Sequence, residues 1–301
     1  MEKNIFAVDI GGSKIICGVL TPTGEILNMW RADYAPGYTV DTLYALIKQG
    51  FDALDDGSCC ACGVAIPGLC DANSGTWLYS PFSGIENIPI TDTLQRMTGL
   101  PTYADNDVNI SALAERYFGV CKNKNDFLWI TVSNGVGGGL VLDGKIYRGA
   151  GLTAGEIGHV VVEDRTARRC GCGTLGCLEA MASGASISDI YRERTGRSVP
   201  TKELAELAYS GDDEAIRVFH EAGGYIGKAA SHAINLLGLD TVVLGGGVAE
   251  AFDLLLPGVR EALNRYAFLR ANPNVEVLHS APGKYAALMG CAALILDQKI
   301  I

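Results

Sequence analysis

The sequence has no hydrophobic run long enough to cross a membrane. Its longest wholly apolar stretch, Ala286 to Leu296, is well short of the roughly 20 residues that a bilayer span needs. The apolar run that begins at Ile5 stops at Asp9, so the opening segment also lacks the long apolar region of a secretory signal. We therefore expect a cytoplasmic protein that does not associate with a membrane.

Positive charge is scarce as well. Lys and Arg total 24 against 34 Asp and Glu, which gives a net charge of −10 and a pI near 4.9. These few cations cannot form a broad basic surface along a phosphate backbone, so we do not expect nucleic acid as a partner. With 301 residues, 48% hydrophobic and 19% charged, the chain has the composition of a folded protein of about two domains.

Several common nucleotide, metal and catalytic motifs are absent. No G-x-x-x-x-G-K-[ST] occurs, which excludes a P-loop, and no serine has glycine at both −2 and +2, which excludes a nucleophile elbow. Residues 171–176 match G-x-G-x-x-G but follow a polar segment instead of a strand, unlike a dinucleotide fingerprint. Residues 105–109 imitate the start of an EF-hand loop, but Ile110 stands where that loop requires glycine.

Glycine, in contrast, is abundant, with 38 residues. Three glycine-rich turns each follow a β-like run, at residues 9–14, 134–139 and 245–247. Glycine lets backbone N–H groups approach a ligand, and successive N–H groups form a nest for anions. A tight hairpin turn would explain any one of the three, but together they favour a site for the phosphates of a nucleotide.

The hydrophobic pattern predicts two strand–glycine–strand segments of similar form. A three-stranded meander is expected over residues 5–30, and a second strand pair at 126–147. Residues 71–89 are interpreted as polar turns and residues 150–180 as loop. Further strands are expected within 60–68, 101–104, 241–248 and 274–280. Helices are expected at 39–54, 91–97, 108–117, 184–195, 201–209, 213–238, 251–269 and 284–297.

A cysteine cluster points to a metal site. Cys170, Cys172 and Cys177, with His159 upstream, supply four ligands for a tetrahedral Zn²⁺, and four protein ligands leave no open position, as in a structural site. The alternative is a group of reduced cysteines in a glycine-rich loop. The seven other cysteines are interpreted as small core residues: Cys17, Cys59, Cys60, Cys62, Cys70, Cys121 and Cys291.

Three carboxylates flank these glycine and cysteine segments, at Asp107, Glu156 and Glu179. Carboxylates and amides that converge on one pocket suit a polyhydroxyl ligand, because each hydroxyl can donate to a carboxylate and accept from an amide N–H. Asp107 is expected near the start of a helix, where it could act as a general base or simply cap the helix.

Six segments, in this order and spacing, resemble the ROK family of sugar kinases and repressors: AVDIGGSKI, DNDVNISALAE, SNGVGGG, GLTAGEIGHVVV, CGCGTLGCLE and VVLGGGV. The resemblance implies an α/β, two-domain actin-like ATPase (ribonuclease H-like) fold with an inter-domain cleft and a zinc-ordered loop. The smaller domain is expected at residues 1–120, completed by the helix at 284–301, and the larger at 121–283. The resemblance implies further that the protein binds ATP–Mg²⁺ and transfers its γ-phosphoryl group to a hexose hydroxyl.

The resemblance also implies a role for each matching residue. The first phosphate turn, with Asp9 near Mg²⁺, comprises Asp9, Gly11, Gly12 and Lys14. The second phosphate turn comprises Asn134, Gly135, Gly137 and Gly138. The adenosine segment comprises Gly245, Gly246 and Gly247. Asn106 binds the sugar and Asp107 is the base. The remaining sugar contacts are Glu156, His159 and Glu179, with His159 also a zinc ligand.

Two departures from the family pattern concern the substrates. Ser133-Asn134-Gly135 replaces Gly-Thr-Gly in the second phosphate turn, and Pro81-Phe82 stands where Pro-Asn is common. Glucose is the first substrate expected. The alternatives are N-acetylmannosamine, N-acetylglucosamine, allose or fructose, or a sugar sensor that has lost catalysis. The DNA-binding repressors are less favoured because the first phosphate turn already begins at residue 9. We expect a homodimer or a dimer of dimers.

Overall fold

The computed structural model describes residues 3–35, 37–80 and 83–300, which group into two compact units. The first comprises Met1–Asn123, Arg148–Thr153 and Tyr285–Ile301, and the second comprises Lys124–Tyr147 and Ala154–Lys284. Pro81 and Phe82, where the sequence departs from the family pattern, lie outside the described residues.

The first unit is built on a five-stranded sheet in the order β3-β2-β1-β4-β8. Its strands are β1 (Asn4–Ile10), β2 (Lys14–Leu20), β3 (Ile26–Asp33), β4 (Cys59–Ile66) and β8 (Thr102–Asn106). β1, β2 and β3 pair antiparallel, which confirms the predicted meander, whereas β4 and β8 join parallel to β1. The carboxyl ends of β1, β4 and β8 therefore share one edge of the sheet.

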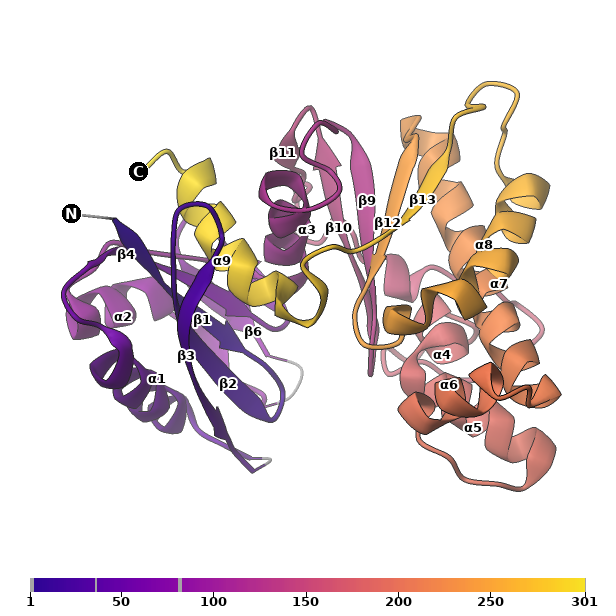
Figure 1. Ribbon diagram of the computed structural model, residues 1–301, viewed down its shortest axis with the longest axis horizontal. Helices are drawn as coiled ribbons and strands as arrows, with labels where there is room; N and C mark the ends of the chain where they lie inside the picture. Colours follow the sequence, from indigo (N-terminus) through magenta and orange to yellow (C-terminus); the bar gives the residue numbers. More distant parts are fainter. Residues whose placement is uncertain (1–2, 36, 81–82, 301) are drawn as a thin grey trace. The chain divides into compact units, whose positions relative to one another are not determined.

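Helices cover both faces of this sheet (Figure 1). Consecutive strand residues point to opposite faces, and Cys17 of β2 lies against Gly50 whereas Gly18 lies against Leu288. Gly50 belongs to α1 (Val40–Leu54) and Leu288 to α9 (Ala286–Asp297), so these helices pack on opposite faces. α2 (Ile90–Thr98) joins the core on the α1 side, and α3 (Asp107–Tyr117) packs against α9.

A second, smaller sheet corrects the expectation that residues 71–89 form only polar turns. β5 (Leu69–Asp71), β6 (Thr76–Tyr79) and β7 (Glu86–Ile88) pair antiparallel. Trp77 of β6 is fully buried, and its Nε1 donates to the carbonyl of Pro67 at 2.9 Å. Strands of three or four residues are too short to show a periodic pattern among polar neighbours, so the sequence did not reveal them.

The sheet of the second unit repeats the topology of the first, in the order β11-β10-β9-β12-β13. Its strands are β9 (Phe127–Val132), β10 (Val136–Leu142), β11 (Lys145–Ile146), β12 (Thr241–Gly245) and β13 (Glu276–His279). Again three antiparallel strands form a meander, and two parallel strands extend it from β9. The repeat agrees with the two similar strand–glycine–strand segments of the sequence.

Five helices pack in the core of the second unit with one face of its sheet. They are α4 (Leu178–Ala182), α5 (Gly184–Thr195), α6 (Thr201–Tyr209), α7 (Asp213–Leu237) and α8 (Phe252–Tyr266). Backbones of α7 and α8 approach so closely that a Cβ at Gly223 would lie 2.1 Å from the carbonyl oxygen of Leu255. All eight helices predicted from the sequence are present; the largest shift is at α8, which ends three residues early at Tyr266.

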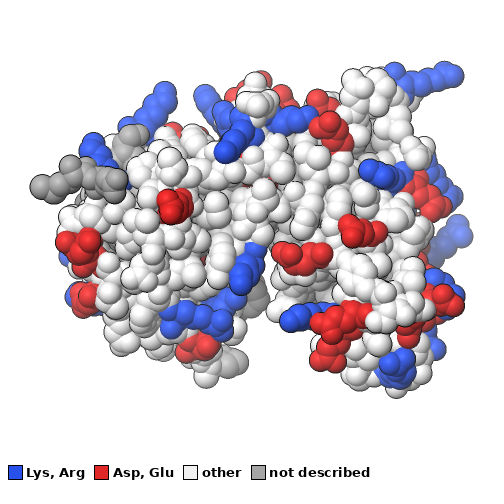
Figure 2. Space-filling view, viewed as in Figure 1, with Lys and Arg blue, Asp and Glu red and all other residues white. Residues whose placement is uncertain are grey.

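None of the described helices is long and apolar enough to cross a bilayer. Basic and acidic side chains are interspersed over the face shown in Figure 2. Ion pairs on the protein surface include those of Arg194 with Glu214 and Glu221.

All ten cysteines are free thiols. Of the seven outside the expected metal cluster, six are buried and Cys60 is half-buried.

Helix α9 leaves no room for a side chain at Gly290. A Cβ there would lie 2.0 Å from the carbonyl oxygen of Ile110 in α3, so we expect Gly290→Ala to lower the free energy of unfolding by about 2 kcal/mol. Gly224 in α7 is the matched control because no atom lies within 4 Å of its Cβ position. Gly224→Ala should raise stability by about 0.5 to 1 kcal/mol. Urea denaturation measures the free energy of unfolding of both variants. Equal changes in the two variants would contradict the packing argument.

Candidate functional site

The first glycine turn joins β1 to β2 in the first unit. The N–H of Gly11 donates to the carbonyl of Lys14 at 2.9 Å, and the hydroxyl of Tyr34 donates to the carbonyl of Gly11, so the turn is fixed from both sides. Asp9 lies just before it, in β1. Burial raises the pKa of Asp9 to about 6, and the nearby ammonium of Lys14 offsets only part of that effect.

Asn106 and Asp107 lie on the same sheet edge, where β8 ends and α3 begins. Asn106 is the N-cap: its Oδ1 accepts from the N–H groups of Val108 at 2.9 Å and Asn109 at 3.2 Å. Its Nδ2 donates to the carbonyl of Gly68 at 2.8 Å, just after β4. Asp107 is the first residue of the helix, and its Oδ1 accepts from the N–H of Val108 at 2.9 Å.

Sequence reasoning missed two charged residues beside this helix start. The buried carboxylate of Asp105 pairs with the guanidinium of Arg148, which is 43 positions away. In the sequence Asp105 is marked only as the start of an EF-hand-like segment, and no motif marks Arg148. No local pattern links residues so far apart, so no signal in a single sequence could have paired them.

In the second unit, the second and third glycine turns come together. β9 and β12 are parallel neighbours, so the segments that follow them leave the same sheet edge. The N–H of Val248 donates to the carbonyl of Val132 at 2.9 Å, and the N–H of Gly184 donates to the carbonyl of Ser133 at 2.7 Å. Gly246 has a φ of +88°, and a Cβ there would lie 2.6 Å from the carbonyl oxygen of Val132. Glycine is therefore required at this position.

A pocket of about 410 Å³ opens beside these turns, a volume in the usual range for small-molecule sites. Two glycine turns, the start of α5 and α6 contribute most of its lining. The side chains and backbone that line it are Ser133, Asn134, Gly184, Thr201, Lys202, Ala205, Glu206, Tyr209, Phe219, Gly247, Val248, Glu250 and Ala251. Sequence reasoning found the glycine turns but missed the helical residues, because no motif marks them.

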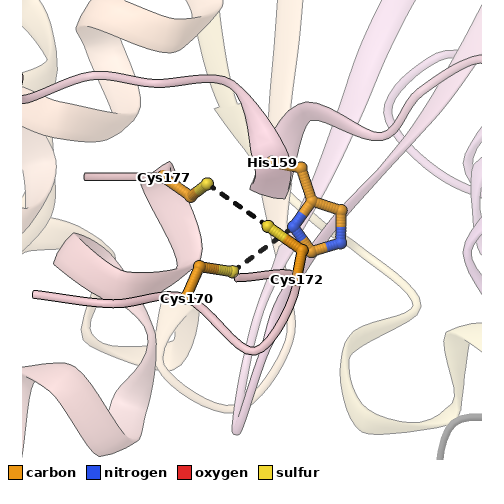
Figure 3. A group of neighbouring side chains, drawn as sticks. All are labelled: His159, Cys170, Cys172 and Cys177. Carbon is orange, nitrogen blue, oxygen red and sulfur yellow. Dashed lines mark hydrogen bonds between the residues drawn. The ribbon is translucent and has the colours of Figure 1, made fainter. Parts of the chain in front are cut away.

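The four predicted metal ligands come together near α4 (Figure 3). Ligand atoms of His159, Cys170, Cys172 and Cys177 all lie within 4.8 Å of one another. The sulfurs of Cys172 and Cys177 are 3.7 Å apart, and the sulfur of Cys170 is 3.5 Å from Nδ1 of His159. Isolated bridges that pair Val161 with Cys177 and Arg169 with Leu175 hold the loop in place. This group could hold a metal ion.

The two carboxylates beside this group have different surroundings. Oε2 of Glu156 is 3.8 Å from Nε2 of His159, the ring nitrogen that faces away from Cys170. Oε2 of Glu179 accepts from the N–H of Val136 at 3.1 Å, and its Oε1 accepts from the thiol of Cys170 at 3.5 Å. The carboxylate of Glu179 therefore links the metal-ligand group to the second glycine turn.

Close backbone packing explains three glycines of this region. A Cβ at Gly155 would lie 2.2 Å from the carbonyl oxygen of Gly138, and one at Gly158 would lie 2.0 Å from that of Val136. The segment that carries Glu156 and His159 thus lies directly on β10. Gly138, interpreted from the sequence as a phosphate contact, also has this packing role.

Comparisons with known proteins agree with this arrangement. A model of the ROK family matches residues 5–298. Glucokinase from Halalkalibacterium halodurans is 30% identical over 315 residues, which cover 97% of this chain and 94% of that protein. The N-acetylglucosamine repressor of Escherichia coli O6:H1 is 32% identical over 244 residues, which cover 78% of this chain and 60% of the repressor.

Among solved structures, a ROK family glucokinase from Streptomyces griseus in complex with glucose and AMPPNP superposes with a TM-score of 0.84. It is 29% identical in sequence, and the match covers 97% of this chain and 98% of that one. The expected α/β fold of the actin-like ATPase class is confirmed.

The buried carboxyl of Asp9 should reduce stability at neutral pH. Its pKa is raised in the folded protein, so the folded state binds the proton more tightly, and this group's contribution to stability falls as pH rises from about 4 to about 6. We expect Asp9→Asn to raise the thermal midpoint at pH 7.5 by on the order of 2 °C, and to leave it unchanged near pH 4. Asp164→Asn, in an exposed loop, is the control. An equal midpoint for Asp9→Asn and the parent at pH 7.5 would contradict the assignment.

Proposed function

Since this chain belongs to the ROK family, we propose that it is an ATP-dependent sugar kinase that transfers the γ-phosphoryl group to a hexose hydroxyl. The observation that carries the proposal is the retained carboxylate of Asp107 at the start of α3, on the same sheet edge as the first phosphate turn. Asp9 and Lys14 are retained on that edge as well. Glucose is the first substrate to test because the glucokinase relatives match nearly the whole chain.

The nucleotide fits the glycine turns in this proposal. Gly12 and Gly135 carry no side chain, and their backbone N–H groups suit phosphate oxygens, whereas the N–H of Gly11 holds the turn itself. The pocket beside Gly247 has apolar walls such as Tyr209 and Val248 with a few polar groups, which suits a base and ribose. Asp9 would lie near Mg²⁺, and the ion, when bound, neutralises charge that develops on the phosphates.

The sugar is assigned to the polar groups that the sequence indicated. Asp107 accepts the proton of the attacking hydroxyl as the oxygen approaches the γ-phosphorus, a general-base contribution of roughly 10² to 10⁴-fold. Asn106 retains an N–H on Nδ2 beyond the one given to Gly68. Glu156, His159 and Glu179 would accept from or donate to the remaining hydroxyls, with Nε2 of His159 on the side away from Cys170.

The cysteine group fits Zn²⁺. Tetrahedral bonds of about 2.3 Å to sulfur and about 2.05 Å to nitrogen separate two sulfurs by about 3.8 Å, and a sulfur from a nitrogen by about 3.6 Å. Two of the observed separations, 3.7 Å between sulfurs and 3.5 Å from sulfur to nitrogen, match these values, and all four ligand atoms lie within 4.8 Å of one another. Hydrogen bonds from Thr174, first from its backbone N–H, lower the pKa of the Cys172 thiol to about 6, whereas burial raises the pKa of Cys170 and Cys177. Only Cys172 therefore favours the thiolate before a metal binds. Zinc would order the loop that carries His159 and precedes Glu179.

A coupled assay of ADP release over a panel of hexoses tests the kinase proposal, with Asp107→Asn as the diagnostic variant. We expect sugar-dependent ADP release from the parent, and a kcat reduced by at least about 100-fold in the variant with sugar binding largely retained. Asp164→Asn, in its exposed loop, serves as the control and should retain the parental rate. A variant that turns over within about threefold of the parent would show that Asp107 is not the base.

Removal of one exposed metal ligand tests the zinc assignment. Cys172→Ser should lose the metal and lower the thermal midpoint, because metal binding contributes to folding of the loop, and it should raise the sugar KM. Cys60→Ser, half-buried outside the group, should retain the metal. Elemental analysis of freshly purified protein measures the zinc content of the parent and of both variants. A fully active parent without zinc would contradict the proposal.

A further inference from the structure

We propose that Asp105 and Arg148 form a positioning pair, which holds the start of α3 so that Asp107 has the orientation needed for phosphoryl transfer. The inference rests on the proposed function only for the role of Asp107. The resemblance assigns no role to Asp105, although this residue opens the segment DNDVNISALAE, and it assigns none to Arg148.

The carboxylate of Asp105 is saturated with donors. Its side chain is only 1% exposed. Oδ2 accepts from Nε of Arg148 at 3.0 Å and also from Nη2 of the same guanidinium. Oδ1 accepts from the N–H of Asn106 at 2.7 Å and from Nδ2 of Asn109 at 3.2 Å. A buried carboxylate with four donors has little capacity left for a ligand, so Asp105 acts on the protein itself.

These donors flank Asp107 on both sides. Asn106 precedes Asp107 and Asn109 follows it by two positions, so one buried carboxylate restrains the cap residue and the first turn of the helix together. The hydroxyl of Ser111 adds a bond to the backbone carbonyl of Asp107 at 2.7 Å. Rotation of the first turn of α3 would break several of these bonds at once, so they restrain the backbone from which the Asp107 side chain projects.

Arg148 supplies the charge from a distant part of the chain. It begins the segment Arg148–Thr153, which groups with the first unit although the residues on either side of it group with the second. Its side chain is 25% exposed. A buried ion pair seldom adds net stability over apolar packing, but loss of one partner leaves an uncompensated buried charge. The place of Asp105 two positions before the proposed base, where it bonds to the start of α3, favours a positioning role.

Steady-state kinetics of Arg148→Ala and Arg148→Lys test the pair. We expect Arg148→Ala to lower kcat about 30- to 100-fold and to change the sugar KM less than about threefold, because misplacement of a reacting group costs turnover more than binding. Arg148→Lys should recover only part of the loss, since one ammonium cannot replace two directed guanidinium donors. Arg31→Ala, which removes an exposed ion pair with Asp33 in the same unit, should retain the parental kinetics.

Chemical rescue separates positioning from a general loss of structure. Arg148→Ala leaves a partly exposed space beside the Asp105 carboxylate, so guanidinium chloride, far below the concentrations that unfold proteins, should restore part of kcat. Sodium chloride at equal ionic strength should not. An unchanged kcat in Arg148→Ala, or a lowered thermal midpoint with unchanged kcat, overturns the proposal. A raised sugar KM with unchanged kcat also overturns it, because Arg148 would then bind sugar.

Hydrogen exchange tests the positioning without turnover. In Arg148→Ala the amides of Asn106, Val108 and Asn109 should exchange faster than in the parent, whereas the amides of α1 should not change. A parent that shows no sugar-dependent ADP release would refute the proposed function alone. Unchanged exchange at the start of α3 would refute the positioning pair, whatever the activity of the parent.

Discussion

The carboxyl ends of parallel strands meet at one edge of a sheet, and both units of this protein depend on that constraint. In the first unit, β1, β4 and β8 end near Asp9, Gly68 and Asn106. In the second, β9 and β12 end at the second and third glycine turns. The parallel pairing of these strands therefore brings together groups that lie far apart in the sequence. Because the two sheets have the same topology, this happens once in each unit.

Glycine has two separate physical roles in this chain. At Gly246 the backbone takes a left-handed conformation, and the turn lies against the end of β9. At Gly155 and Gly158 the backbone instead packs directly on β10, where a Cβ would meet a carbonyl oxygen. The sequence predicted glycine turns for phosphates, but it could not separate ligand approach from internal packing. Ligand approach and internal packing both require a residue without a side chain. Only the three-dimensional structure shows which atoms lie against each glycine.

Features with a local cause could be predicted from the sequence. The first meander follows from alternation and turn residues, and the helices from their hydrophobic period; the metal-ligand group follows from close cysteine spacing. Features with a distant cause could not. β6 depends on burial of Trp77 and on its hydrogen bond to the carbonyl of Pro67. The pocket depends on residues of α6, such as Tyr209, that lie near the glycine turns only in the folded chain. The pair of Asp105 and Arg148 has the same origin.

Burial gives two aspartates of the first unit opposite roles. Asp105 is buried and receives four hydrogen bonds, two from a guanidinium, so its charge is balanced within the protein. Asp9 lies in the sheet with only Lys14 to offset burial, and its pKa is raised to about 6. A carboxylate that the fold leaves poorly compensated gains most from a cation brought by a ligand. The local environment therefore distinguishes a carboxylate whose hydrogen bonds are supplied within the protein from one that burial leaves with a raised pKa.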